Sequence, residues 1–312
     1  MHIDVRRLST RALASESAYA TRYMTTFESL LHTASNGTGT LGRAARGALA
    51  VGPREVAPDV VSSLRFQFGS KERRAAEHRL TTCHEPSDYL KFAEAYLPGN
   101  RYHVSGASQK TGEFLSFLEF AARRNPRVVL EIGTQAGGTN FLLGQAIASV
   151  QLVIGIDLYA RNRLRLESFR RAGLDVHLID GRSASSNVHE QVRKLLGQRT
   201  IDLLFVDGDH SFTGAAEDFR RYRPLVTPKG LIAFHDIVPD NQLCNGIASG
   251  AWAGEVPILW EILRTQYVHH EFVDSWNQEG SGIGVLDHDP KIKPRLAPRR
   301  GMSAEAASAE AT

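Results

Sequence analysis

The residues of this chain best suited to chemistry are ionisable side chains that follow two short apolar runs, 201–206 and 231–234. After the first run stand Asp207, Asp209 and His210, and after the second stand His235 and Asp236. Carboxylates and imidazoles can hold a divalent metal ion, and an imidazole can accept a proton from a reacting group. The pattern therefore indicates an active site that contains a metal.

Both apolar runs have the composition of strands that are covered on both faces of a sheet. The segment 213–222 lies between them and repeats apolar residues among charges, as an amphipathic helix does, and Pro228-Lys229-Gly230 indicates a turn. Strand–helix–strand units form parallel sheets, and ligands bind beyond the carboxyl ends of the strands. We therefore expect the two groups of polar side chains to meet at one rim.

The same alternation extends over most of the chain and predicts an α/β fold: a Rossmann-like, doubly wound, mostly parallel seven-stranded sheet with an antiparallel C-terminal edge and an N-terminal extension. The predicted strands are 128–132, 152–156, 176–179, 201–206, 231–234, 271–276 and 282–286. The predicted helices are 88–96, 110–124, 139–149, 161–172, 188–196, 213–222 and 256–267. The long segment 237–255 has no period and is typical of a lid, in which Trp252 could stack on an acceptor or pack down on closure.

We divide the chain into an extension at 1–104, a catalytic domain at 105–287 and a disordered tail at 288–312. In the extension, 21–32 and 43–50 are expected helices, whereas 51–68 shows no period. Two interpretations of residues 1–70 stay open. They either pack on the domain, as a cap or a homo-oligomer contact, or they are partly disordered.

Composition restricts the classes of function. A formal net charge of +3 over 312 residues gives no case for a nucleic-acid partner. Two cysteines support neither a disulfide framework nor a thiolate zinc site. No apolar run reaches the roughly 18 residues that a membrane span needs, and the N-terminus lacks the apolar core of a secretory signal. We expect a cytoplasmic protein without a membrane partner, acting on a small molecule.

A glycine turn follows the first predicted strand, in the order strand, Gly133, Gly137, helix. Its spacing, G-x-x-x-G-G, differs from the dinucleotide pattern G-x-G-x-x-G and disfavours a nicotinamide dehydrogenase. Asp157 ends the next strand, where a carboxylate can accept hydrogen bonds from both ribose hydroxyls. Asp180 and Arg182 follow the third strand and are suited to the edge of an adenine. Together these strand ends favour a nucleoside site.

The motifs VVLEIGTQAGGTNFLL, VIGIDLYAR, IDGRS, IDLLFVDGDHSF and LVTPKGLIAFHDI carry a resemblance to a known family. The chain resembles class I S-adenosylmethionine-dependent O-methyltransferases over about residues 105–287. It is most similar to the branch of the macrocin and mycinamicin sugar methyltransferases and the cephalosporin hydroxylase-type proteins. The resemblance implies that the methionine part of S-adenosylmethionine (SAM) is lined by Glu131, Gly133 and Gly137. It implies further cofactor contacts at Asp157, Asp180, Arg182 and Gln109.

The resemblance also implies a divalent metal, Mg or Mn, held by Asp207, His235 and Asp236. His235 stands where that branch has a carboxylate, and Mn or Fe accepts imidazole more readily than Mg does. His235 is therefore either a ligand or a core histidine. His210 stands where the sugar enzymes have a histidine and catechol-type enzymes a lysine base. Asp209 either takes part in catalysis or only orients His210.

These observations predict methyl transfer from SAM to a hydroxyl group of a sugar-containing or other small natural product, with His210 as the base. Two alternatives stay open. The fold could bind the cofactor and assist another activity, as in the hydroxylase-type relatives, or it could be a non-catalytic nucleotide-binding partner. The intact set of Asp207, His210, His235 and Asp236 favours the enzyme, since a mere binder has no need of it.

Overall fold

The computed structural model describes residues 40–97, 110–248 and 251–296. The chain divides into two compact units, on either side of Val61, and the boundaries predicted at 104 and 287 remain predictions. Among the described residues, each helix is too short or too polar to cross a bilayer. The helix predicted at 21–32 lies outside the described residues.

In the described part of the chain, four helices come before α6 and the sheet: α2 (Thr40–Val51), α3 (Pro53–Phe68), α4 (Ser70–Leu80) and α5 (Pro86–Tyr96). The expected helices at 43–50 and 88–96 are confirmed as parts of α2 and α5. Sequence analysis missed α3, in which Pro58 lies inside the helix. Proline is tolerated in the first turn of a helix but disfavoured later, so Pro58 weakens the sequence signal.

The second unit carries the predicted alternation of strands and helices. After α4 and α5, its helices are α6 (Thr111–Arg123), α7 (Gly138–Ala146), α8 (Arg163–Ser168), α9 (Ser186–Leu196), α10 (Phe212–Tyr222), α11 (Asn241–Asn245) and α12 (Val256–Arg264), with a 3-10 turn, η2 (Arg223–Leu225). Its strands are β1 (Val128–Ile132), β2 (Leu152–Asp157), β3 (Asp175–Asp180), β4 (Ile201–Val206), β5 (Val226–His235), β6 (His269–Phe272) and β7 (Ile283–Asp287).

The strands form one seven-stranded sheet in the order β3-β2-β1-β4-β5-β7-β6. Strands β1 to β5 pair in parallel, and β7 pairs antiparallel with both β5 and β6. The predicted fold class, including the antiparallel C-terminal edge, is confirmed. The chain reverses its direction of winding between β1 and β4, and such a switch point opens a crevice at the carboxyl ends of the strands.

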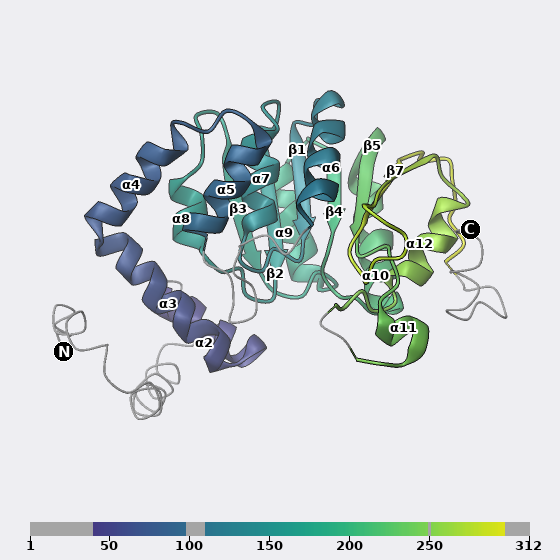
Figure 1. Ribbon diagram of the computed structural model, residues 1–312, viewed down its shortest axis with the longest axis horizontal. Helices are drawn as coiled ribbons and strands as arrows, with labels where there is room; N and C mark the ends of the chain where they lie inside the picture. The colour runs from purple at the N-terminus through teal and green to yellow at the C-terminus, as the bar shows by residue number, and fades with distance from the viewer. Residues whose placement is uncertain (1–39, 98–109, 249–250, 297–312) are drawn as a thin grey trace. The chain divides into compact units, whose positions relative to one another are not determined.

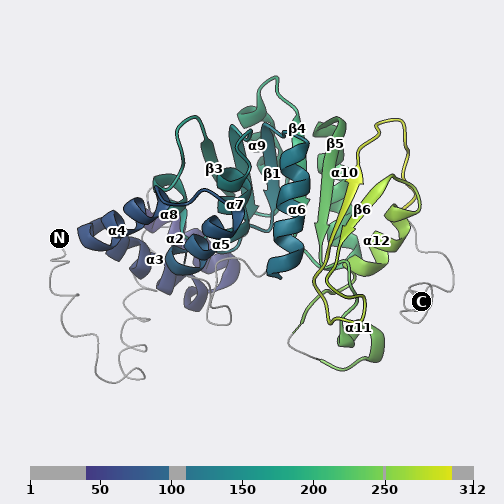
Figure 2. The ribbon, with the colours of Figure 1, turned by 45° about the horizontal axis from the view of Figure 1, so that its top comes forward.

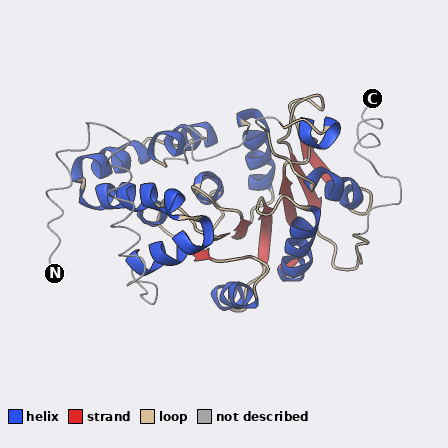
Figure 3. Cartoon of the chain, turned by 90° about the horizontal axis from the view of Figure 1, so that it is seen from below, coloured by secondary structure: helices blue, strands red, loops and turns tan. Residues whose placement is uncertain are grey.

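The sheet lies between two layers of helices (Figure 3). Alternate residues of each strand enter different cores: in β1, Val129 packs with the phenylalanines of α5, α6 and α7, whereas Val128 and Leu130 pack with α9, α10 and α12. All five residues of β1 are buried. Continuous apolar composition in these strands therefore reflects burial on both faces, as predicted.

Several other segments differ from the sequence-based prediction: α8 covers only Arg163–Ser168 of the predicted 161–172, and sequence analysis missed α4 and α11. The turn predicted at 228–230 lies inside β5, because the N–H of Lys229 donates to the carbonyl of His288 and the N–H of His288 donates to that of Gly230 (both 2.8 Å). β6 ends at Phe272, not at 276. Residues 288–296, predicted as the start of a disordered tail, pack on α10 and α12: Arg223 donates to the carbonyl of Ile292, and Gln266 exchanges hydrogen bonds with Arg295.

The glycine turn after β1 depends on the absence of a side chain at Gly133. Its φ of +93° is in the left-handed region, and a Cβ atom there would lie 1.7 Å from the carbonyl oxygen of Asp207. The N–H of Asp207 donates to the carbonyl of Ile132 at 2.8 Å, which draws the ends of β1 and β4 together. The backbone of the glycine turn thus touches the first residue of the acidic rim.

We expect Gly133→Ala to destabilise the protein strongly, because the new methyl group cannot coexist with the Asp207 carbonyl and the backbone is strained for any side chain. The loss in free energy of unfolding should be about 3 kcal/mol or more, measured by urea denaturation. Gly173→Ala is the matched control: Gly173 also has a positive φ, +77°, but no atom lies within 4 Å of the place that its Cβ atom would take. An equal, small loss in both variants would contradict the steric argument.

Candidate active site

Four predicted residues of the rim meet at the carboxyl ends of β4 and β5. These strands pair in parallel, with Val206 beside Phe234, so the residues that follow them emerge side by side. Asp207 follows β4, His235 is the last residue of β5, and Asp236 follows it. Helix α11 lies beyond the carboxyl end of β5, at the bottom of Figure 2.

The side chains of these residues face one another. Nδ1 of His235 lies 3.4 Å from Asp207 Oδ1 and 3.1 Å from Asp236 Oδ2. His210 lies between the same carboxylates, with Nε2 3.4 Å from Asp207 Oδ1 and Nδ1 3.5 Å from Asp236 Oδ2. Donor atoms of Asp207, His210 and Asp236 all lie within 4.8 Å of one another.

This donor set fits a divalent metal ion. Ligand atoms at about 2.1 Å from a metal in octahedral geometry are about 3.0 Å apart when adjacent and about 4.2 Å apart when opposite. The nitrogen–oxygen distances of 3.1–3.5 Å are close to the adjacent value. Two carboxylates with imidazole nitrogens suit manganese, iron or zinc as well as magnesium. Asp207 and Asp236 would be the ligands that such an ion requires.

Without an ion, the two histidines balance the two carboxylates. Burial lowers the pKa of His210, but its hydrogen bond to Asp207 and the charges of both carboxylates raise it to about 9. The pKa of His235 is likewise raised well above its ordinary value, with burial opposed by Asp236 and Asp207. Burial alone would raise the pKa of Asp207, but His235 and His210 lower it. Binding a cation between the carboxylates must therefore release protons from the histidines.

His235 differs from His210 in its surroundings. Its side chain is 5% exposed, and its Nε2 is buried without a hydrogen-bond partner in the described part of the chain. A histidine that binds metal normally donates its second ring N–H to another group. His235 therefore lacks the support that most histidine ligands have, although its Nδ1 points into the cluster.

The ring of His210 is held by the segment before α12. Its Nδ1 lies 2.8 Å from the carbonyl oxygen of Trp252, which can only accept, so Nδ1 carries the proton. In the neutral ring this leaves Nε2 as the acceptor. The N–H of Glu255 donates to the carbonyl of His210 at 2.7 Å, and its carboxylate accepts from the N–H of Phe212. Gly254 fits tightly, because a Cβ atom there would lie 2.4 Å from the His210 carbonyl.

Asp209 is turned toward α10 and away from this cluster. Its Oδ1 accepts from the N–H of Ser211 at 2.9 Å, and its carboxyl group packs on Gly214 in the first turn of the helix. Ser211 itself caps α10 by accepting from the N–H of Gly214. Asp209 thus shapes the loop that presents His210; its catalytic role stays a prediction.

Glu131 lies in β1, two residues before Gly133. It is 1% exposed and accepts a hydrogen bond from Asn140 at 3.0 Å. Burial raises its pKa to about 8, although the nearby Thr134 hydroxyl group and the hydrogen bond from Asn140 lower it. A cation bound beside Glu131 would stabilise its ionised form and lower this pKa.

The predicted nucleoside residues lie at the ends of β2 and β3, which pair Asp157 with Asp180. Asp157 accepts from the N–H of Gln135 (2.7 Å) and of Tyr159 (3.0 Å), so it also fixes the glycine turn. Burial raises its pKa. Asp180 accepts from the N–H of Ala160 and pairs with Arg163 at 3.2 Å, whereas Arg182 is exposed. Gly137 caps the start of α7 with a φ of +81°, and Gln109 lies outside the described residues.

Sequence analysis missed three groups that hold the site: the Trp252 carbonyl, Asp240 and Glu113. Asp240 is 2% exposed; its Oδ2 accepts from the N–H of Ala253 at 2.7 Å, and its Oδ1 caps α11. A carbonyl leaves no sequence signal. The motif Pro-Asp before a short polar helix could have identified Asp240 as a cap, but not its contact with the later segment.

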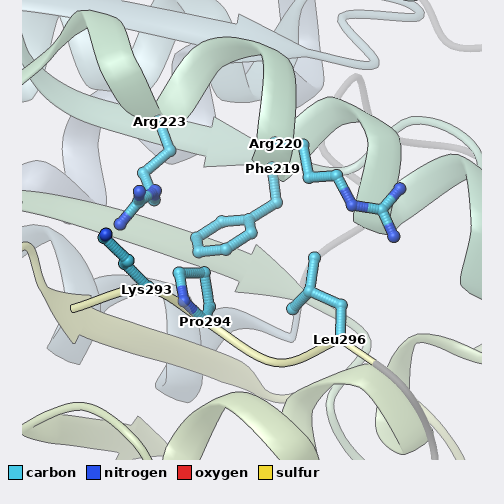
Figure 4. Close-up of a pocket in the computed structure, with 6 residues that line it drawn as sticks. All are labelled: Phe219, Arg220, Arg223, Lys293, Pro294 and Leu296. Carbon is cyan, nitrogen blue, oxygen red and sulfur yellow. The ribbon is translucent and has the colours of Figure 1, made fainter.

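A separate pocket of about 250 Å³ lies at the C-terminal end of α10 (Figure 4). It is lined by Phe219, Arg220, Arg223, Lys293, Pro294 and Leu296. These residues offer cations and apolar surface but no carboxylate, imidazole or thiol. We therefore place the chemistry at the rim, at the opposite end of α10.

Comparisons with known proteins concern the part of the chain that carries this rim. Residues 130–237, from β1 through the end of β5, match a family model described as a methyltransferase domain. A search of curated proteins found no match. Among solved structures, the chain is similar to an O-methyltransferase from Bacillus cereus with SAH bound, at 16% identity and a TM-score of 0.45, covering 65% of this chain and 90% of that one. It is also similar to TomG, an O-methyltransferase of tomaymycin synthesis from Streptomyces achromogenes with SAM bound, at 18% identity, a TM-score of 0.44 and coverage of 65% and 89%.

Glu131 gives a pH-dependent prediction. The folded protein holds its proton up to about pH 8 whereas the unfolded chain releases it near 4.5, so stability falls as the pH rises through this window. Glu131→Gln removes the ionisation. It should stabilise the ligand-free protein at pH 8, by roughly 4 kcal/mol at most, and have little effect near pH 4.5. Urea denaturation at both pH values tests this, with exposed Glu119→Gln as the control. Equal effects of the two substitutions at pH 8 would show that Glu131 is not buried as an acid.

Proposed function

We propose that this chain, whose residues 130–237 match a methyltransferase domain, transfers a methyl group from SAM to a hydroxyl oxygen of a small acceptor, assisted by a divalent metal ion. The observation that supports this most is a juxtaposition. The Gly133 turn, suited to the methyl donor, touches the backbone of Asp207, and Asp207 begins the cluster suited to the acceptor. A methyl donor bound at the Gly133 turn and an acceptor bound at the cluster would therefore both lie next to Asp207.

Residues on one side of that contact are suited to the donor. The Glu131 carboxyl group can pair with the ammonium group of the methionine part, which would favour its ionised form. Asp157 retains lone pairs for the ribose hydroxyls, since each of its oxygens accepts only one backbone hydrogen bond. Asp180 stands at the neighbouring strand end, next to the position expected for adenine.

Residues on the other side are suited to a hydroxyl acceptor. Asp207 and Asp236 would hold the metal, with His235 as a third candidate ligand. When bound, such an ion supplies Lewis acidity that lowers the pKa of a nearby hydroxyl group. The two carboxylates would also orient the acceptor oxygen toward the Gly133 turn, where the methyl donor would be bound.

His210 is the proposed proton acceptor. A cation bound between Asp207 and Asp236 would offset the charges that raise the pKa of His210, which favours the neutral ring that a base requires. The Trp252 carbonyl keeps the proton on Nδ1, so Nε2 takes the hydroxyl proton. As the oxygen–methyl bond forms, the sulfonium carbon–sulfur bond breaks and SAH leaves as a neutral thioether. The protein's task is alignment for in-line attack.

The acceptor itself is proposed to be a sugar-containing or other small natural product. The Trp252 side chain is 77% exposed next to the His210 ring, with ring centroids 5.9 Å apart. An exposed indole beside a proton acceptor is suited to stacking on a sugar or aromatic ring. Its exposed surface supports an acceptor of that class.

Other expectations accompany this proposal. We expect Mg or Mn as the metal, with Mn favoured if His235 is a ligand. We also propose a cytoplasmic protein that has neither nucleic acid nor a membrane as partner, and a homo-oligomer contact through the N-terminal extension.

The central test is metal-dependent methyl transfer from SAM. With a panel of glycosylated and phenolic hydroxyl acceptors, excess chelator should abolish SAH production, and Mn or Mg should restore it. Asp207→Ala should lower kcat at least about 100-fold while leaving SAH affinity, measured by calorimetry, within a few-fold of wild type. Exposed Asp175→Ala is the matched control. Full turnover in chelator would contradict metal assistance, and a chain that binds no SAH would contradict the methyl donor.

His210→Ala tests the base. Loss of a general base lowers kcat by roughly 10²–10⁴-fold, and KM for SAM should stay unchanged, because His210 lies on the acceptor side. His177→Ala, on the outer strand β3, is the matched control. Trp252→Ala should instead raise the KM of the acceptor and spare kcat, because the Trp252 carbonyl remains. A His210→Ala enzyme with normal kcat would assign proton removal to another group, and Asp209 would be examined next.

A further inference from the structure

We propose that Glu113, a buried carboxylate on α6, is a positioning residue for Asp236 and acts through the loop that joins β6 to β7. The inference rests on the proposed function, in which Asp236 holds the metal. Glu113 and Asp236 are far apart in the sequence, but α6 lies against β6 and β7 (Figure 2), and the loop between those strands reaches both carboxylates.

Glu113 accepts three hydrogen bonds from this loop. It is 2% exposed. Its Oε1 accepts from the N–H of Asp274 at 3.1 Å and from Nε2 of Gln278 at 2.5 Å, and its Oε2 accepts from the N–H of Gly282 at 2.9 Å. A buried carboxylate is costly unless it is well hydrogen-bonded, so these contacts fix the loop firmly on α6.

The loop passes this restraint to the active site through two consecutive N–H groups. The N–H of Gly282 donates to Glu113, and the N–H of Ser281 donates to Asp236 Oδ1 at 3.0 Å. Gly280, Ser281 and Gly282 all have positive φ values, of 69°, 64° and 81°. This run of left-handed residues turns neighbouring N–H groups toward two different carboxylates, as consecutive N–H groups do in anion-binding loops.

Asp236 depends on that hydrogen bond for its orientation. Its own φ is +61°, a conformation that a non-glycine residue keeps only when its surroundings enforce it. With Oδ1 held by Ser281, Oδ2 faces His235 and His210. The same loop pairs with the backbone after Asp236, through the N–H of Val238 to the Ser281 carbonyl at 3.0 Å. Releasing the loop would free both the carboxylate and the backbone that carries it.

The first turn of α6 also blocks the loop from shifting sideways. A Cβ atom at Gly112 would lie 2.8 Å from Oδ1 of Asp274, so α6 and the start of the loop are in close contact. The start of the loop is therefore held by this packing and by the hydrogen bond from Asp274 to Glu113. The end of the loop, which adjoins Asp236, is held by the hydrogen bond from Gly282 to Glu113.

Metal affinity in Glu113→Gln tests the inference. An amide has one acceptor oxygen, and its NH₂ group would face one of the N–H donors, so the loop loses at least one contact. Changes in groups that support a metal ligand weaken metal binding about 10–100-fold. We expect that loss for Mn²⁺, measured on the full chain by the electron paramagnetic resonance signal of free Mn²⁺. SAH affinity should stay within about 2-fold of wild type. Glu119→Gln, at an exposed position of α6, should bind Mn²⁺ as wild type does.

A double substitution separates positioning from a general loss of structure. If Glu113 acts through Asp236, adding Glu113→Gln to Asp236→Asn should weaken Mn²⁺ binding no further, because coupled residues are not additive. Additive losses would overturn the inference. So would a Glu113→Gln protein with wild-type Mn²⁺ affinity, while the proposed function would stand. If Glu113→Gln does not fold, Gln278→Ala removes one of the three hydrogen bonds to Glu113, together with the bonds of Gln278 to Ser275 and Gly280 within the loop. It should give a smaller loss of the same kind, and no loss would overturn the inference.

A wild-type protein that binds no Mn²⁺ or Mg²⁺ would contradict metal assistance and leave positioning to be decided by structure. In a crystal structure of Glu113→Gln, the Asp236 carboxylate should then have left the Ser281 N–H. An Asp236 carboxylate still within hydrogen-bond distance of it would overturn the inference.

Discussion

The close approach of two backbones, at Gly133 and Asp207, is the constraint on which the rest of the site depends. Strands β1 and β4 are neighbours across the switch point of the sheet, and the Asp207 N–H binds the carbonyl that precedes Gly133. No side chain fits between them. The turn that is suited to the methyl donor and the rim that is suited to the acceptor are therefore built as one unit, whose spacing is set by main-chain atoms.

Much of this arrangement follows from the sequence, because burial on both faces of a parallel sheet leaves a direct trace. The predicted bounds of β1 and β4 are those that the structure shows, since each is a mostly apolar run that ends at a glycine turn or at polar residues. Parallel pairing then brings Asp207 and Asp236 together without further information. The alternation of strands and helices also predicts the parallel strands of the sheet, and the two final strands in succession predict its antiparallel edge.

What the sequence does not predict is held by contacts between distant residues. Pro228 and Gly230 have the local composition of a turn, yet hydrogen bonds with His288 keep them within β5. Glu113 resembles any other charge on an amphipathic helix, and only the folded loop shows why it is buried. The orientation of His210 depends on a carbonyl group, which every residue type possesses. The spacing of apolar and polar residues along the sequence does not predict such contacts.

The Trp252 contact separates two properties that often change together in enzymes. Its main chain fixes the ring of His210, whereas its indole is exposed. A substitution at this position alters the surface offered to the acceptor but leaves the carbonyl in place. Relatives of this chain could therefore diverge in what they recognise through residue 252 and still inherit the same proton-handling histidine, with no compensating change elsewhere.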